Sequence, residues 1–301
     1  MIRAAAVLLL GPVIGSEARA QSSPLGQARQ VTASYTFDLV PAPDGQRAVM
    51  IRIVGGREQL FTVKLDGTGE KQITSADADH EDPVWSPDGR KIAYVLVKGG
   101  KKVVHLMNAD GTGSVAVTPA TQSAIHPAFT PDGEEILYCT DDDLRPPEKN
   151  ESQIYAVDIA SKRVRTLISG GVNTYPVMSP DGRKIAWRKI IGDMNSEVFV
   201  ADADGSNARN VTNHWSWEGW PAWSPDGRTI AFAGSRNNSY QIFLMDPDGS
   251  NVRLLANTEG RGTSPKWSAD GRSIFYTVCR RSQDRTGCDI FKVDVAGEGA
   301  R

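Results

Sequence analysis

An Asp-Gly dipeptide recurs along almost the whole chain at a nearly constant interval. One series begins at Asp44 and advances in steps of 22 residues to Asp132. A second begins at Asp181 and advances in steps of 22 or 23 residues to Asp270. Asp-Gly is a strong signal for a tight hairpin turn, because Gly readily adopts the positive φ angle that such turns require. Two turns in each unit of about 44 residues predict four short antiparallel strands per unit.

Every second turn has a longer shared sequence, and the number of these turns gives the number of repeat units. Five read Pro-Asp-Gly and the sixth reads Ala-Asp-Gly; they begin at Pro43, Pro87, Pro131, Pro180, Pro225 and Ala269. Each is followed by a short apolar strand, such as Ile92-Ala93-Tyr94. Six repeats of four short strands predict an all-β fold, a six-bladed β-propeller.

The two ends of the repeat array complement each other. The sixth unit ends near Val295 without a fourth strand, whereas the segment from Ala28 to Thr32 resembles the fourth strands of the other units. We expect this N-terminal segment to pair with the last blade and close the ring, which would leave no exposed strand edge.

The charge balance excludes some classes of partner. The 301 residues carry a formal net charge of −2, which gives no support to a nucleic-acid binder or a polybasic membrane-surface protein. No apolar run of 18 or more residues follows the N-terminal segment, so we expect no membrane span in the mature chain. We expect the propeller, residues 21–301, to be a monomer.

The first twenty residues have the pattern of a secretion signal. Arg3 gives a positive start, the residues from Ala4 to Ile14 are mostly apolar, and Ala18-Arg19-Ala20 is a small-x-small cleavage pattern. We therefore expect residues 1–20 to be a signal peptide cleaved after Ala20, and the mature protein to be periplasmic. The alternative is an apolar helix that is kept as an anchor.

The three cysteines fit an exported protein that does not depend on a disulfide framework. Cys279 and Cys288 flank a polar stretch between two predicted strands, and they could bridge the two legs of a hairpin if their Cα atoms lie within about 7 Å. A bridge and two free thiols both remain open. Cys139 lies within a strand-like run and is predicted to be a packed free thiol.

Six positions differ from blade to blade while the frame around them repeats. Each lies six residues before a turn Asp, where the repeat geometry places it in the innermost strand at one mouth of the central channel. Five of the six precede a proline, and the first blade has Leu39 instead. These positions are Asp38, Asp82, His126, Tyr175, Trp220 and Ser264. Variation within a repeated frame is typical of a binding site carried by a scaffold.

Four neighbours complete the candidate partner-binding site at this mouth. They are Glu81, Trp215, Trp217 and Glu218. Tryptophans at a mouth are good anchors for a protein and good stacking surfaces for a sugar. For Trp215, Trp217 and Trp220, the alternative is a small local core around His214.

A divalent cation such as calcium is a second interpretation of the same mouth. Asp38, Asp82 and His126 supply carboxylates and one imidazole, which suit hard or borderline ions. The alternative is that loops beside a channel are simply polar and hydrated. The ring positions themselves offer no Arg or Lys that could hold an acidic sugar.

The motif Trp85-Ser86-Pro87-Asp88-Gly89-Arg90-Lys91-Ile92-Ala93 and its five counterparts resemble the WD40-like (PD40) propeller repeats of the TolB family. Related propellers occur in prolyl oligopeptidases, tricorn protease and oligogalacturonate lyases. The resemblance covers nearly the whole mature chain and implies the propeller fold. It leaves function open, because one scaffold hosts both binders and enzymes. The α/β domain of TolB is expected to be absent here, and no Gly-x-Ser-x-Gly motif of a peptidase occurs.

Three functions follow from these observations. The first is a non-catalytic propeller of the cell envelope that docks a protein, and the resemblance implies a peptidoglycan-associated lipoprotein as the model partner. The second is a metal-dependent enzyme that resembles oligogalacturonate lyase, which His126, as the only histidine of the ring, supports poorly. The third is a saccharide-binding propeller that uses Trp215, Trp217 and Trp220. We expect the first, and no catalytic residues.

Overall fold

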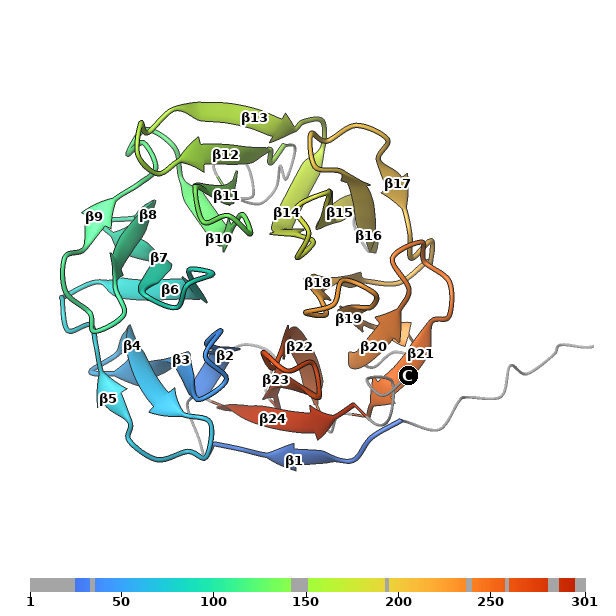
Figure 1. Cartoon of the computed structure of the whole chain (residues 1–301), viewed down its shortest axis with the longest axis horizontal. Helices are drawn as coiled ribbons and strands as arrows, with labels where there is room; N and C mark the ends of the chain where they lie inside the picture. The colour runs from blue at the N-terminus through green and yellow to red at the C-terminus, as the bar shows by residue number, and fades with distance from the viewer. Residues whose placement is uncertain are drawn as a thin grey trace, which may run out of the picture.

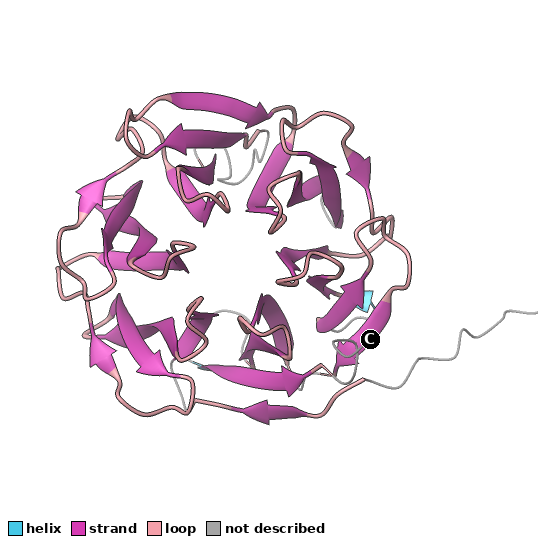
Figure 2. Cartoon of the chain, viewed as in Figure 1, coloured by secondary structure: helices cyan, strands magenta, loops and turns pink. Residues whose placement is uncertain are grey.

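Six four-stranded antiparallel sheets surround a central channel, as Figure 1 and Figure 2 show. The computed structural model describes residues 25–32, 36–141, 151–192, 195–236, 240–257, 260–280 and 287–295. The predicted signal peptide, residues 1–20, lies outside these ranges. Within them, no helix is long and apolar enough to cross a membrane.

The strands of each blade follow one another along the chain, from the channel outward. Blade 1 contains β2 (Thr36–Pro41), β3 (Arg47–Val54), β4 (Arg57–Lys64) and β5 (Lys71–Gln72). Blade 2 contains β6 (Asp79–Trp85), β7 (Lys91–Lys98), β8 (Lys101–Asn108) and β9 (Val115–Ala116). Blade 3 contains β10 (Ala124–Phe129), β11 (Glu135–Thr140), β12 (Ile154–Asp158) and β13 (Val164–Ile168).

The second half of the ring repeats this arrangement, except that its last blade takes one strand from the start of the chain. Blade 4 contains β14 (Val172–Met178), β15 (Lys184–Gly192), β16 (Asn195–Asp202) and β17 (Arg209–Asn210). Blade 5 contains β18 (Glu218–Trp223), β19 (Ile230–Gly234), β20 (Gln241–Met245) and β21 (Arg253–Ala256). Blade 6 contains β22 (Arg261–Trp267), β23 (Ser273–Cys279), β24 (Cys288–Asp294) and β1 (Ala28–Gln30).

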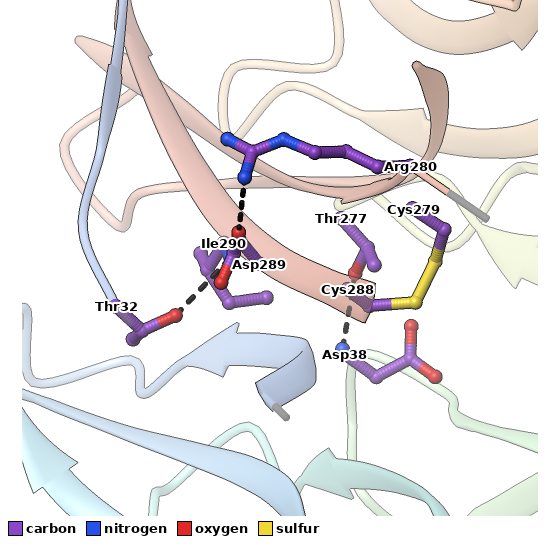
Figure 3. Close-up of a disulfide and its surroundings, with 8 residues drawn as sticks. All are labelled: Thr32, Asp38, Thr277, Cys279, Arg280, Cys288, Asp289 and Ile290. Carbon is purple, nitrogen blue, oxygen red and sulfur yellow. Dashed lines mark hydrogen bonds and ion pairs between the residues drawn. A yellow bond between two sulfur atoms is a disulfide. The ribbon is translucent and has the colours of Figure 1, made fainter. Parts of the chain in front are cut away.

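The predicted closure of the ring is confirmed. Strand β1 pairs antiparallel with β24, with Ala28 opposite Val293. Beyond the strand, the Val31 N–H donates to the Ile290 carbonyl at 2.8 Å. The Ile290 N–H donates to Thr32 Oγ1 at 3.1 Å (Figure 3). The N-terminal segment therefore supplies the fourth strand that the sixth repeat lacks, and it covers the edge of β24.

The Asp-Gly turns that follow the innermost strands share one hydrogen-bond pattern. In blades 2 to 6 the Asp Oδ1 accepts the hydroxyl of the Ser or Thr two residues earlier, at 2.6–2.7 Å. It also accepts the backbone N–H two residues later, as Asp88 does from Arg90. These bonds lower the pKa of each turn Asp, with the Ser86 hydroxyl as the largest influence on Asp88. A local side-chain network thus stabilises each of these five turns.

The six turns also lie close to one another around the channel. A Cβ placed on the Gly of each turn would lie 3.6–3.9 Å from the Pro of the preceding blade's turn, or from Ala269 in the case of Gly45. Between blades, apolar side chains form mixed clusters, and the Trp85 indole donates to the Val40 carbonyl at 3.0 Å. Each blade is therefore packed against both of its neighbours.

A disulfide joins the two legs of the hairpin between β23 and β24. Cys279 and Cys288 lie opposite each other in the register, with Cα atoms 4.0 Å apart (Figure 3). This result settles the alternative that the sequence left open. Cys139 is a buried free thiol, as predicted.

We predict that the denatured, unreduced protein titrates one thiol and the reduced protein three. Loss of the bridge in the double variant Cys279→Ser/Cys288→Ser should lower the free energy of unfolding by about 2–3 kcal/mol, because the closed loop is short. Thiol titration and urea unfolding measure the two effects. Three reactive thiols before reduction would contradict the bridge.

Candidate functional site

The six candidate ring residues share an unusual backbone conformation. Their φ angles all lie between 50° and 55°, in the left-handed region that L-residues rarely adopt. Each one lies at a β-bulge where the innermost strand has one more residue than its partner, as between Glu81 and Val84 in blade 2. The same register shift occurs in all six blades. The residues that sequence analysis selected by position alone thus form one structural class.

Proline and neighbouring blades explain why the strand can bulge at this point. Proline carries no N–H, so the residue after the bulge in blades 2 to 6 has no ladder hydrogen bond to lose. In two blades, the N–H of the bulge residue donates to a side chain of the preceding blade in the ring. The His126 N–H donates to Asp82 Oδ2 at 3.2 Å. The Asp38 N–H donates to Thr277 Oγ1 at 3.1 Å (Figure 3).

All six ring residues line one cavity of about 440 Å³ on the channel axis. The cavity extends from the ring toward the turns, where Pro43, Pro225 and Ala269 line it. Its walls differ in chemistry from blade to blade: blades 1 and 2 contribute carboxylates, blades 3 to 5 contribute rings, and blade 6 contributes Ser264 and Lys266. The structure therefore brings the predicted ring together around a space that can hold a ligand.

The ring side chains of blades 3 to 5 form a continuous aromatic wall. The centroids of His126 and Tyr175 are 3.6 Å apart and stacked, and those of Tyr175 and Trp220 are 5.4 Å apart. His126 Nδ1 lies 3.2 Å from the sulfur of the buried Cys139. Burial lowers the pKa of His126 to about 4, so the imidazole is neutral at neutral pH.

The carboxylate wall already contains one ion-pair network. Lys102 Nζ lies 3.5 Å from Glu81 Oε2 and 3.3 Å from Asp141 Oδ2. Asp82 Oδ2 lies 4.0 Å from His126 Nε2, in addition to accepting the His126 N–H. Asp82 therefore links the carboxylate wall to the aromatic wall.

Sequence analysis missed the cations at this site. Lys266 lines the cavity at a position where the other blades have Val40, Val84, Ala128, Val177 and Ala222. Burial lowers the pKa of Lys266, whereas the charges of Asp38 and Asp82 raise it. Lys102 also lines the cavity, so basic side chains reach this site although the six ring positions themselves carry none. Comparison of strand positions two residues beyond the ring would have revealed Lys266.

Three other expectations about the mouth need correction. The Glu218 side chain is fully buried and pairs with Arg236, with 3.1 Å between Oε2 and Nη2, so it does not face the mouth. Trp215 and Trp217 do not line the cavity; Trp215 is 69% exposed on the neighbouring loop, and Trp217 packs against Arg188. Of the three tryptophans, only Trp220 reaches the cavity.

The donor geometry does not favour a metal ion. Throughout the part of the chain that the structure describes, no group of three or more His, Cys, Asp or Glu side chains is placed to hold one. Asp38, Asp82 and His126 therefore line one cavity without forming a ligand set. Lys102, Arg188 and Lys266 also lower the pKa of His126, although burial has the largest effect.

The fold and the cavity define a closed propeller with a ligand-sized site at one mouth of its channel. Comparison with known families gives a more specific result: the chain belongs to the TolB β-propeller domain family (PD40), which matches residues 25–183 and 91–301. No curated protein matches the chain.

Several solved structures share the fold. A putative TolB from Agrobacterium tumefaciens is 21% identical with a TM-score of 0.67, over 89% of this chain and 96% of that one. TolB from Acinetobacter baumannii is 19% identical with a TM-score of 0.65, over 88% of this chain and 65% of that one. Oligogalacturonate lyase from Vibrio parahaemolyticus is 12% identical with a TM-score of 0.60, over 91% and 94%. At these identities the likeness shows the fold alone.

The left-handed bulge predicts opposite effects for two substitutions of Ser264. Ser264→Gly should leave the free energy of unfolding within about 0.5 kcal/mol of wild type, because Gly tolerates φ near 53°. Ser264→Val should lower it by about 1–2 kcal/mol, because a β-branched side chain is strained there. Urea unfolding measures both. Thr263→Val is the control from the same strand and should be near neutral; equal loss in both valine variants would count against the bulge.

The depressed pKa of His126 predicts a loss of stability in mild acid. Below pH 6.5 the unfolded chain protonates this histidine and the native chain does not until about pH 4, so stability falls as the pH falls between these values. The contribution reaches about 3 kcal/mol at the acid end. Thermal or urea unfolding from pH 7 to pH 4 should show a shallower decline for His126→Gln than for wild type. Parallel declines would show that His126 is protonated in the native state.

Proposed function

We propose that this protein is an exported propeller of the cell envelope that docks a protein partner at the ring mouth of its channel. One observation carries the proposal: six side chains that differ in charge, polarity and size occupy the same bulge position around one cavity. A uniform backbone with variable side chains suits recognition of a particular surface. Family membership supports a protein-binding propeller in general terms.

The site suits binding better than catalysis. Trp220 and Tyr175 offer the kind of large, partly enclosed aromatic anchors that dominate protein interfaces. His126 is neutral and stacked, and burial raises the pKa of the Cys139 thiol, so neither is prepared as a base or nucleophile near pH 7. The lyase alternative needs metal ligands that the described residues do not bring together.

The N-terminal sequence supports the location. An Arg-led apolar segment followed by Ala18-Arg19-Ala20 is the pattern of an exported protein, and the partner is then another envelope protein. A peptidoglycan-associated lipoprotein is the partner to test first, on the resemblance to TolB. Cell fractionation with N-terminal sequencing of the mature chain tests export; a chain that starts at Met1 in the cytoplasm would overturn it.

We predict that a crosslinked pull-down from envelope extract of the source cell captures a partner through the mouth. Wild type should capture it, and Asp38→Ala/Asp82→Ala/Trp220→Ala should lose it, because these changes remove both walls of the cavity. Arg90→Gln, which alters an exposed side chain that does not line the cavity, is the control and should behave as wild type. Purified partner should then bind with the same dependence on the variants. Equal capture by wild type and the triple variant would place the interface elsewhere.

A further inference from the structure

One lysine lies in a layer of the channel that is otherwise apolar. Lys266 follows the ring residue of blade 6 by two positions in β22, and it lines the cavity. The corresponding residues of the other five blades line the same cavity. They are Val40, Val84, Ala128, Val177 and Ala222. The Lys266 side chain therefore enters a space in which its five counterparts offer no polar side-chain atom.

The Lys266 amine has no direct partner within the protein. Among the residues that the structure describes, it makes neither a hydrogen bond nor an ion pair. Burial lowers its pKa, and the charges of Asp38 and Asp82 offset this only in part. Burial of an unpaired ammonium is costly, because the charge loses its hydration. Lys266 thus costs stability that a sixth apolar residue would not.

The smallest residue of the ring lies beside this lysine. Ser264 is the ring residue of the same strand, and none of the other five ring side chains is as small. Ser264 and Lys266 line one cavity of about 440 Å³. A cavity of this size suits a small molecule. The amine therefore faces a space that a small ligand can fill.

A lysine in apolar surroundings is suited to react with a carbonyl group. Removal of the amine from bulk water favours its neutral form, which is the nucleophile. We infer that Lys266 binds an aldehyde or ketone by forming a reversible imine inside the channel. This inference concerns a small ligand and does not depend on the proposed docking of a protein.

The step conserves atoms and electrons. The nitrogen lone pair of Lys266 forms a bond to the carbonyl carbon while the π electrons move to oxygen, and a proton passes from nitrogen to oxygen. In the resulting carbinolamine, the carbon–oxygen bond breaks and the hydroxyl group leaves as water with a proton taken from solvent. A protonated imine remains, and addition of water reverses the sequence without any oxidant or reductant. Asp38 and Asp82, whose charges act on the Lys266 amine, would stabilise the positive imine.

The charges of the cavity favour a neutral carbonyl compound over an anion. Among the described residues, the carboxylates of Asp38, Glu81 and Asp82 line it. Lys102, the other lysine of the lining, lies 3.5 Å from Glu81. An anion beside Lys266 would meet the repulsion of Asp38 and Asp82, whereas an uncharged carbonyl group would not.

The apolar layer also restricts the rest of the ligand. The side chains of Val84, Val177 and Ala222 offer no hydrogen bonds to hydroxyl groups, which would be left unpaired there. An open-chain sugar is therefore disfavoured. An aldehyde or ketone with an aromatic or aliphatic body suits the layer better, because it gains from leaving water.

Reductive alkylation of the folded protein tests the inference. The wild type is incubated at pH 7 with benzaldehyde and sodium cyanoborohydride, which reduces an imine to a stable secondary amine. Peptide mass spectrometry then locates the modified lysines. Lys266 should be labelled about tenfold faster than Lys98, an exposed lysine that does not line the cavity. Glyceraldehyde, a polar aldehyde, should show no preference for Lys266.

Two variants and one competitor complete the test. Lys266→Met should lose the first benzyl group that wild type acquires, as intact-protein mass spectrometry measures, and circular dichroism should confirm that it folds. Lys98→Met is the matched control and should keep that group. Benzoate has the same ring as benzaldehyde but forms no imine, so it should not protect Lys266 from labelling.

Three outcomes would overturn the inference. Labelling of Lys266 no faster than that of Lys98 would show that the amine is neither activated nor reached. An equal preference for Lys266 with glyceraldehyde would remove the apolar body from the ligand. Protection by benzoate would show that Lys266 binds an anion instead of a carbonyl group.

Discussion

The pairing of β1 with β24 is the interaction on which the rest of the molecule depends. A ring of blades has to close on itself, and here the closing strand comes from the far end of the sequence. Without that pairing, β24 would present a free edge, and blades 1 and 6 would be joined only by side chains. The bulges, the cavity and the opposed charges at the mouth all presuppose that blade 6 lies beside blade 1. The hydrogen bond from the Asp38 N–H to Thr277 Oγ1 is a direct contact between blades 1 and 6.

The fold could be predicted because its signals are local and repeated. An Asp-Gly turn is specified by a few adjacent residues, and ten of them in two series with steps of 22 or 23 residues leave little choice of architecture. The ring positions followed from counting within the repeat, and the structure gives all six the same backbone conformation. The side-chain directions could not be predicted in the same way. Regular alternation puts Glu218 on the same face as Trp220, but the bulge interrupts the alternation, and Glu218 is buried against Arg236.

Contacts between blades were the other limit. Arg188 belongs to the second strand of blade 4, yet its guanidinium lies over the ring residue of blade 5. Nothing in the spacing of the repeat indicates which side chain crosses an interface, because that depends on the twist between sheets and on the space that Gly219 leaves. The contact of Arg188 with Trp220 could therefore not be predicted from the ring positions alone.

The circle of neighbouring turns around the channel has a mechanical consequence. Each turn rests against the turn before it, so a tilt of any one blade is transmitted to its neighbour and so on around the circle. We therefore expect the channel to resist widening, because all six turns would have to move together. We expect a ligand in the cavity to meet a space of nearly fixed diameter. Selection there depends on the shape and charge of what enters, and evolution can exchange the ring side chains without altering the frame that carries them.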